Sequence, residues 1–137
     1  MRSVPSYIFN TAPRLHDGYD PGGYNQLKIN QLDTQNADLF AQKISTTGTK
    51  LWSEEGVALC TAEFAQYGPR MAPDDNGGCY VVWDDLRNGN APNDDIYAQH
   101  LSSTGVALWE ANGKPICTAP NQQNGSLIKV SNNTVFI

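Results

Sequence analysis

The sequence has few charged residues and no long apolar run. Lys, Arg, Asp and Glu make up 17% of its 137 residues, and the nine basic residues are outnumbered by 14 acidic ones and spread along the chain. Nucleic-acid binding needs clustered Lys and Arg, and a membrane-spanning helix needs ~20 consecutive apolar residues. The composition therefore predicts a protein with no nucleic-acid partner and no membrane insertion.

An export signal is also missing from the start of the sequence. Residues Met1–Asn10 lack the cationic start and the long apolar centre of a secretory signal peptide. If the protein is secreted or attached to the cell surface, we expect its signal to lie outside this chain.

Helical patterning is absent as well. No stretch repeats apolar residues at the i, i+3, i+4, i+7 spacing of an amphipathic helix. Twelve glycines, eight prolines and many Asn and Asp residues instead separate short runs rich in Val, Ile, Tyr and Trp. Short strands joined by turns produce this pattern, so the sequence predicts an all-β fold.

An internal repeat is the main positive signal. Asp38–Ala62 aligns without a gap with Asp95–Ala119, 57 residues further on, and twelve of the 25 aligned residues are identical. A period of this kind is typical of solenoids, propellers and arrays. We therefore predict tandem four-stranded antiparallel sheets, with residues 1–37 as a degenerate partial repeat or irregular lead-in, 38–68 as the end of a first unit, 69–123 as a second unit and 124–137 as the start of a third.

The run Tyr80–Trp83 is apolar at consecutive positions, so we expect both faces of its strand to be buried. Radial stacking of sheets in a β-propeller buries both faces in this way. A β-sandwich is the alternative fold, because it too has many short strands, and a β-solenoid is a third. The propeller is favoured because a sandwich does not require a unit to recur at a fixed offset.

Three segments of the repeat carry a family resemblance. They are Gly77–Gly89, which reads Gly-Gly-x-Tyr-Val-Val-Trp-Asp-Asp-x-Arg-Asn-Gly, then Asp95–Gln99 and Gly105–Trp109. Together they resemble the blades of bacterial secreted β-propeller proteins. Ser45–Trp52 and Ser102–Trp109 also resemble a degenerate Asp-box, the hairpin of sialidase-like propellers.

The resemblance implies a non-catalytic repeat module of an exported or cell-surface protein, with a structural role or a protein or glycan ligand. The implied partners are further blades, in the same polypeptide or by homo-oligomerisation. A fragment of a sialidase-like propeller glycoside hydrolase is the alternative, so enzymatic activity stays open, although no catalytic residue can be assigned.

The richest polar segment follows the apolar run. Its carboxylates suit calcium, which takes 6–8 oxygen ligands, so Asp84, Asp85, Asp94 and Asp95 are the candidate metal ligands. The competing interpretation is a turn in which Arg87 forms a bidentate pair with Asp85 or Asp95. The candidate ligand-binding residues are Trp83, Arg87 and Asn90.

The remaining aromatic and sulfur residues are predicted to be structural. Trp52 and Trp109 are repeat equivalents and should pack between units, whereas Trp83 borders a polar loop and is expected to be partly exposed. Cys60 and Cys117 are also repeat equivalents, too far apart for a disulfide. With Cys79 they are expected to be buried thiols.

Overall fold

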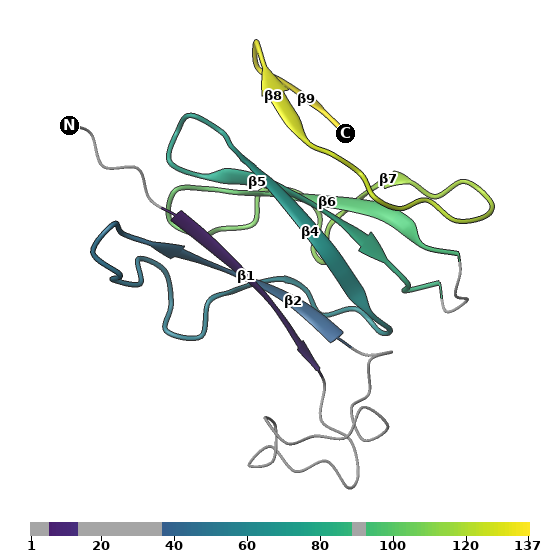
Figure 1. Cartoon of the computed structure of the whole chain (residues 1–137), viewed down its shortest axis with the longest axis horizontal. Coiled ribbons are helices and arrows are strands. Elements are labelled where there is room, and N and C mark those ends of the chain that lie inside the picture. Colours follow the sequence, from purple (N-terminus) through teal and green to yellow (C-terminus); the bar gives the residue numbers. More distant parts are fainter. Residues whose placement is uncertain (1–5, 14–36, 89–92) are drawn as a thin grey trace, which may run out of the picture.

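A computed structural model describes residues 6–13, 37–88 and 93–137 (Figure 1). These residues form nine β-strands and no helix, so the predicted all-β class is confirmed. Accordingly, no helix in the described residues is long and apolar enough to cross a membrane. The predicted lead-in 1–37 falls largely outside the described residues.

The strands form two larger antiparallel sheets and one hairpin. The first sheet has the order β1-β2-β3, with β1 (Ser6–Pro13), β2 (Ala37–Ile44) and β3 (Val57–Cys60). The second sheet has the order β4-β5-β6-β7, with β4 (Gln66–Pro73), β5 (Cys79–Asp85), β6 (Asp95–Leu101) and β7 (Lys114–Cys117). The C-terminal hairpin pairs β8 (Lys129–Ser131) with β9 (Thr134–Phe136) and lies beyond β4 and β5 in Figure 1.

The strands β2 and β3 have the same local structure as β6 and β7, at the 57-residue offset. Gln42 Oε1 accepts a hydrogen bond from Trp52 N at 3.1 Å, and Gln99 Oε1 accepts one from Trp109 N at 2.9 Å. The register shift between Leu39 and Phe40 returns between Ile96 and Tyr97. The identical residues of the sequence repeat therefore specify one hairpin geometry twice.

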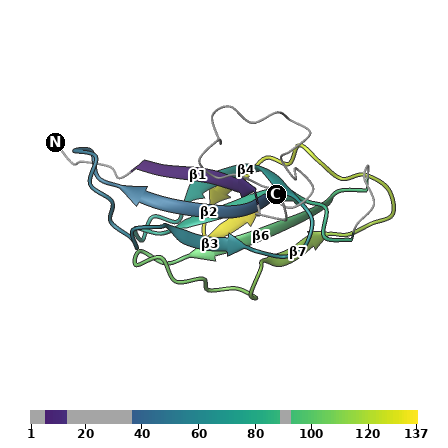
Figure 2. The same cartoon turned by 90° about the horizontal axis from the view of Figure 1, so that it is seen from below.

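The core lies between the first and second sheets, which pack face to face and are both seen from below in Figure 2. The strands β2, β5 and β6 contribute alternate residues to it, because successive side chains in a strand point to opposite faces. The contributors from the first sheet and its loop are Leu39, Ala41, Trp52, Leu59 and Cys60, and those from the second sheet are Cys79, Val81, Trp83, Tyr97 and Leu101.

The opposite face of the second sheet holds a smaller cluster. Val82, Ile96 and Ala98 are buried there, with Trp109 and Ile128 packed against them. Since Val81 and Val82 are both 0% exposed, the expectation that β5 is buried on both faces is confirmed.

The strand β1 occupies the place in the first sheet that β5 occupies in the second. Ser6 lies opposite Ile44, as Cys79 lies opposite Leu101. Ile44 and Leu101 are repeat equivalents, but Ser6 and Cys79 are 73 residues apart rather than 57. A search at constant offset therefore could not find β1.

Candidate functional site

The acidic segment joins the ends of β5 and β6. Asp84 and Asp85 end β5, and Asp95 begins β6 directly opposite Asp85. All three carboxylates and that of Asp94 are buried. Asn90, one of the three predicted ligand-binding residues, lies outside the described residues.

Arg87 and Asp85 form the predicted bidentate pair. Arg87 Nε donates to Asp85 Oδ1 at 2.9 Å, and Arg87 Nη2 donates to Asp85 Oδ2 at 2.6 Å. Trp83 Nε1 donates to the same Oδ2 at 2.8 Å. Charge-assisted fork geometry of this kind gives strong, directional hydrogen bonds, so the ion-pair interpretation of Arg87 is confirmed with Asp85 as the partner.

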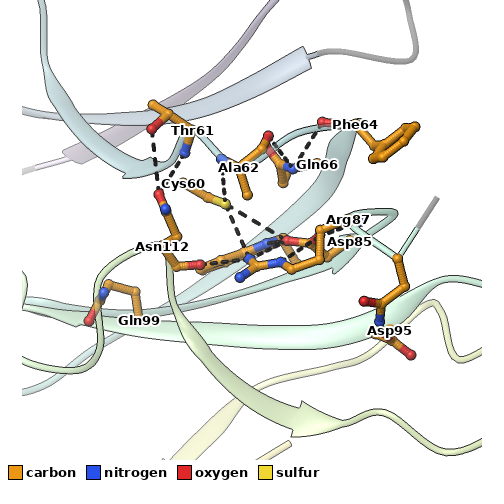
Figure 3. A network of polar contacts seen from close by, with 12 residues as sticks. Cys60, Thr61, Ala62, Phe64, Gln66, Asp85, Arg87, Asp95, Gln99 and Asn112 are labelled. Atoms are coloured by element: carbon orange, nitrogen blue, oxygen red, sulfur yellow. Dashed lines mark hydrogen bonds and ion pairs between the residues drawn. The ribbon is translucent and has the colours of Figure 1, made fainter.

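The Arg87 guanidinium also connects the two sheets (Figure 3). Its Nη2 donates to Cys60 Sγ at 3.2 Å, at the end of β3, and to the carbonyl of Asn112 at 2.7 Å. Asn112 in turn accepts a hydrogen bond from Thr61 N at 2.9 Å. The guanidinium carbon lies 3.6 Å from the centroid of the Tyr97 ring, in cation–π geometry. One cation thus bridges the end of the first sheet and the β6–β7 loop.

Burial sets the ionisation of this network. Desolvation raises the pKa of the Cys60 thiol to about 11, even though Arg87 lies beside it. Burial alone would lower the pKa of Arg87, but the hydrogen bond and charge of Asp85 more than offset this and raise it. The thiol is therefore neutral and the guanidinium charged around pH 7, which is the chemistry of a structural tie rather than of a nucleophile.

The Trp83 ring is not exposed, so the expectation of partial exposure is wrong. Trp83 is 0% exposed. It faces the first sheet, and a methyl group added at Gly113 would lie 2.4 Å from its ring. The sequence could not reveal this, because the burial comes from another sheet and from a glycine 30 residues away.

Asp84 and Asp94 lie on the other face of the second sheet. Gln122 Nε2 donates to Asp94 Oδ2 at 2.9 Å, and Gly125 N donates to Asp84 Oδ2 at 3.4 Å. Asp84 Oδ1 is buried and accepts no hydrogen bond from any described residue. Burial raises the pKa of Asp84; the Gly125 amide opposes this, and the charge of Asp94 adds to it.

The four predicted metal ligands therefore divide between two faces. Asp85 is saturated by Arg87 and Trp83, and Asp95 accepts a hydrogen bond from Asn88. Among the described residues, no group of three or more His, Cys, Asp or Glu side chains is arranged to hold a metal ion. Calcium binding stays a prediction. Asp84 and Asp94 are the better candidates for ligands among the four, because Asp84 Oδ1 accepts no hydrogen bond from a described residue.

No family model matches this chain. Comparison with curated proteins and with solved structures also finds no match.

Asn112 is a member of the network that sequence reasoning missed. Its repeat equivalent is Glu55, so the alignment gives no signal at this position. Its backbone has a φ of 63°, in the left-handed region that Asn tolerates better than most residues. An Asn before a glycine in a loop is a weak clue to such a turn, but not to a contact with another sheet.

Proposed function

We propose that this chain is a non-catalytic β-propeller repeat module of an exported or cell-surface protein, with a structural role or a protein or glycan ligand. The observation that carries the proposal is the recurrence of one hairpin at the 57-residue offset, with the two copies on sheets packed face to face. Radially repeated sheets pack in this manner.

The state of the polar site supports the non-catalytic part of the proposal. Arg87 and Asp85 bind each other. Asp85 also accepts a hydrogen bond from Trp83, and Arg87 donates one to Asn112. A catalytic acid or nucleophile must present a group to a substrate, whereas these groups face protein. Their contacts across two sheets are those of residues that hold neighbouring repeats together.

A ligand would then bind beyond the end of β5. Asn88 is exposed there, and Arg87, the preceding residue, is half-buried. Amide side chains are suited to hydrogen bonds with the hydroxyl groups of a glycan or the backbone of a peptide.

The test is a hydrolysis assay with the whole chain on fluorogenic glycosides, including sialosides, alongside binding to a glycan array. We expect the rate of glycoside cleavage to equal that of the buffer blank. Cleavage that disappears in Asp84→Asn or Asp94→Asn would overturn the proposal in favour of the glycoside hydrolase alternative, because retaining and inverting glycosidases depend on a carboxylate pair.

A further inference from the structure

The five core residues that the first sheet contributes recur on the second sheet. Adding 57 to the numbers of Leu39, Ala41, Trp52, Leu59 and Cys60 gives Ile96, Ala98, Trp109, Ile116 and Cys117. Four of these, Ile96, Ala98, Trp109 and Cys117, belong to or pack against the cluster on the face directed away from the first sheet. We call this set of five the outer face of the second sheet.

This face is only partly covered. Ile116 is 39% exposed, whereas its counterpart Leu59 is 2% exposed. Trp109 and Cys117 are half-buried, while Trp52 and Cys60 are buried. The C-terminal segment covers part of the face through Ile128, and an open cavity of about 380 Å³ lined by Ile96, Ile116 and Cys117 remains beside it.

The first sheet has a surface that could bind this outer face. Within one copy, Tyr97 and Leu101 of β6 pack against the first sheet. Their counterparts at the same offset are Phe40 and Ile44 of β2. These two half-buried residues line an open cavity of about 220 Å³. Because Leu39 and Ala41 point into the core, Phe40 and Ile44 belong to the opposite face, which we call the outer face of the first sheet.

Two contacts that Trp52 makes between the sheets involve residues whose repeat equivalents, on the outer face of the first sheet, are open to a partner. The Trp52 ring packs on Gly105, where an added methyl group would lie 3.0 Å from it, and Trp52 Nε1 donates to the Ser103 carbonyl at 3.0 Å. The counterpart of Gly105 is Gly48, and a methyl group added there would meet nothing within 4 Å. Gly48 thus presents the open surface on which a second Trp109 could lie.

We propose that the outer face of the second sheet binds the outer face of the first sheet of a second copy of this chain, by the contacts that hold the two sheets together within one copy. Trp109 then packs on Gly48 of the neighbouring copy, and its Nε1 donates to the carbonyl of Thr46, the counterpart of Ser103. The association deepens the proposed function and rests on it. It is head-to-tail, because the two faces differ, and so builds a closed ring or an open filament.

Strand number agrees with this arrangement. The first sheet has three described strands, and β1, the equivalent of β5, lies at its edge, so this sheet has no described equivalent of β4. The residues equivalent to β4 begin at Gln123, whose Nε2 donates to the carbonyl of Asn121 at 2.7 Å, as that of Gln66 donates to the carbonyl of Phe64 at 3.0 Å. In the proposed association, the C-terminal segment of one copy would extend the β1 edge of the next, as the β4 equivalent.

The first experiment compares the solution mass of the whole chain and of Ile116→Glu by light scattering over a range of concentrations. We expect a discrete oligomer or filament for the wild type and a monomer for the variant, with association weakened roughly 100-fold or more by the unpaired buried charge. Leu108→Glu is the matched control. Its counterpart Leu51 stays 49% exposed beside an occupied interface, so Leu108→Glu should leave the mass unchanged.

A mixing experiment tests the head-to-tail geometry. Ile44→Glu damages the other outer face, so each variant alone should be monomeric. An equimolar mixture should form a one-to-one dimer that grows no further, because each chain supplies one intact face. A monomeric wild type at the highest soluble concentration, an Ile116→Glu mass equal to that of the wild type, or two monomeric variants that fail to pair would each overturn the proposal.

Thiol labelling separates failure of this interface from failure of the repeat module. Cys117 should react with a thiol reagent in Ile116→Glu and be protected in the wild-type oligomer, while Cys60 and Cys79 stay protected in both, since both are 0% exposed. Rapid reaction of Cys117 alone in the wild type contradicts the association only. Equally rapid reaction of Cys60 and Cys79 contradicts the packing of the two sheets, and with it the proposed function.

Discussion

Trp52 and Trp109 occupy the same position in two copies of one hairpin, yet their surroundings differ. Trp52 is 9% exposed and donates across the sheet interface to the Ser103 carbonyl. Trp109 is half-buried and contacts rings of its own sheet, with centroids 5.7 Å from Tyr80 and 5.9 Å from His100. The local sequence therefore sets the conformation of this tryptophan, and the neighbouring sheet sets how much of it is buried.

The largest effect should come from removing each tryptophan in the Ile116→Glu background, which keeps the chain monomeric. Trp52→Ala should lower the free energy of unfolding by about 3–5 kcal/mol, because it opens a cavity between two sheets. Trp109→Ala should cost roughly 1–2 kcal/mol, since its ring is already partly solvated. Urea unfolding measures both, and equal losses would contradict the difference in burial.

The second-largest loss of stability should come from breaking the Arg87–Asp85 network that connects the two sheets. Asp85→Ala leaves the half-buried Arg87 guanidinium and the buried Trp83 indole N–H without their carboxylate, and removing one partner of a buried pair costs about 3 kcal/mol or more. Lys50→Ala is the matched control, because it breaks an exposed ion pair with Glu54, and such pairs contribute at most about 1 kcal/mol. A loss for Asp85→Ala as small as that of the control would show that the network carries little of the stability.

Gly48 and Gly105 allow the strain of a turn to be separated from the crowding of an interface. Both have positive φ angles, 87° and 83°, so an alanine at either site costs roughly 1–2 kcal/mol of backbone strain. At Gly105 the added methyl group also meets Val57 at 2.9 Å and Trp52 at 3.0 Å, whereas at Gly48 it meets nothing within 4 Å.

In monomeric Ile116→Glu, Gly105→Ala should therefore destabilise the chain more than Gly48→Ala, by about 1 kcal/mol or more. In the oligomer the two losses should become similar, because Trp109 of a neighbour then covers Gly48. Thermal unfolding of both variants in both backgrounds makes this comparison, and an unchanged difference in the oligomer argues against that contact.

The parts of the fold that the sequence could predict are those specified by local chemistry. The β2–β3 and β6–β7 hairpins follow from identical residues such as Gln42 and Gln99, which bind the same backbone groups. The Arg87–Asp85 pair is equally local, since only one residue separates its members. What could not be predicted depends on contacts distant in sequence.

Three such contacts show why. The strand β1 pairs with β2 across residues 14–36, and its offset from β5 differs from the repeat period. Trp83 borders a polar loop in the sequence but is covered by the first sheet. Asn112, which accepts a hydrogen bond from Arg87, also accepts one from Thr61, 51 residues away, and no pattern within either hairpin encodes that distance.

The smallest effect should come from Asp84, on the face that the first sheet does not cover. Its pKa is raised mainly by burial and further by the Asp94 charge, so the folded state binds the proton more tightly than the unfolded chain does. Ionised Asp84 therefore reduces stability above its raised pKa, and this penalty fades as the pH falls toward the unfolded value of about 3.9.

Asp84→Asn removes the charge and should raise the free energy of unfolding at pH 7 by on the order of 1 kcal/mol. The gain should vanish near pH 3.5 or below, a range set by the ordinary aspartate pKa of about 3.9. The same comparison is repeated with calcium. An ion bound by Asp84 and Asp94 would stabilise the wild type, so that Asp84→Asn would then lower the free energy of unfolding instead of raising it. If calcium raises the unfolding temperature of the wild type and not of Asp84→Asn, the two carboxylates form a metal site, and if it raises neither, their proximity is simply tolerated.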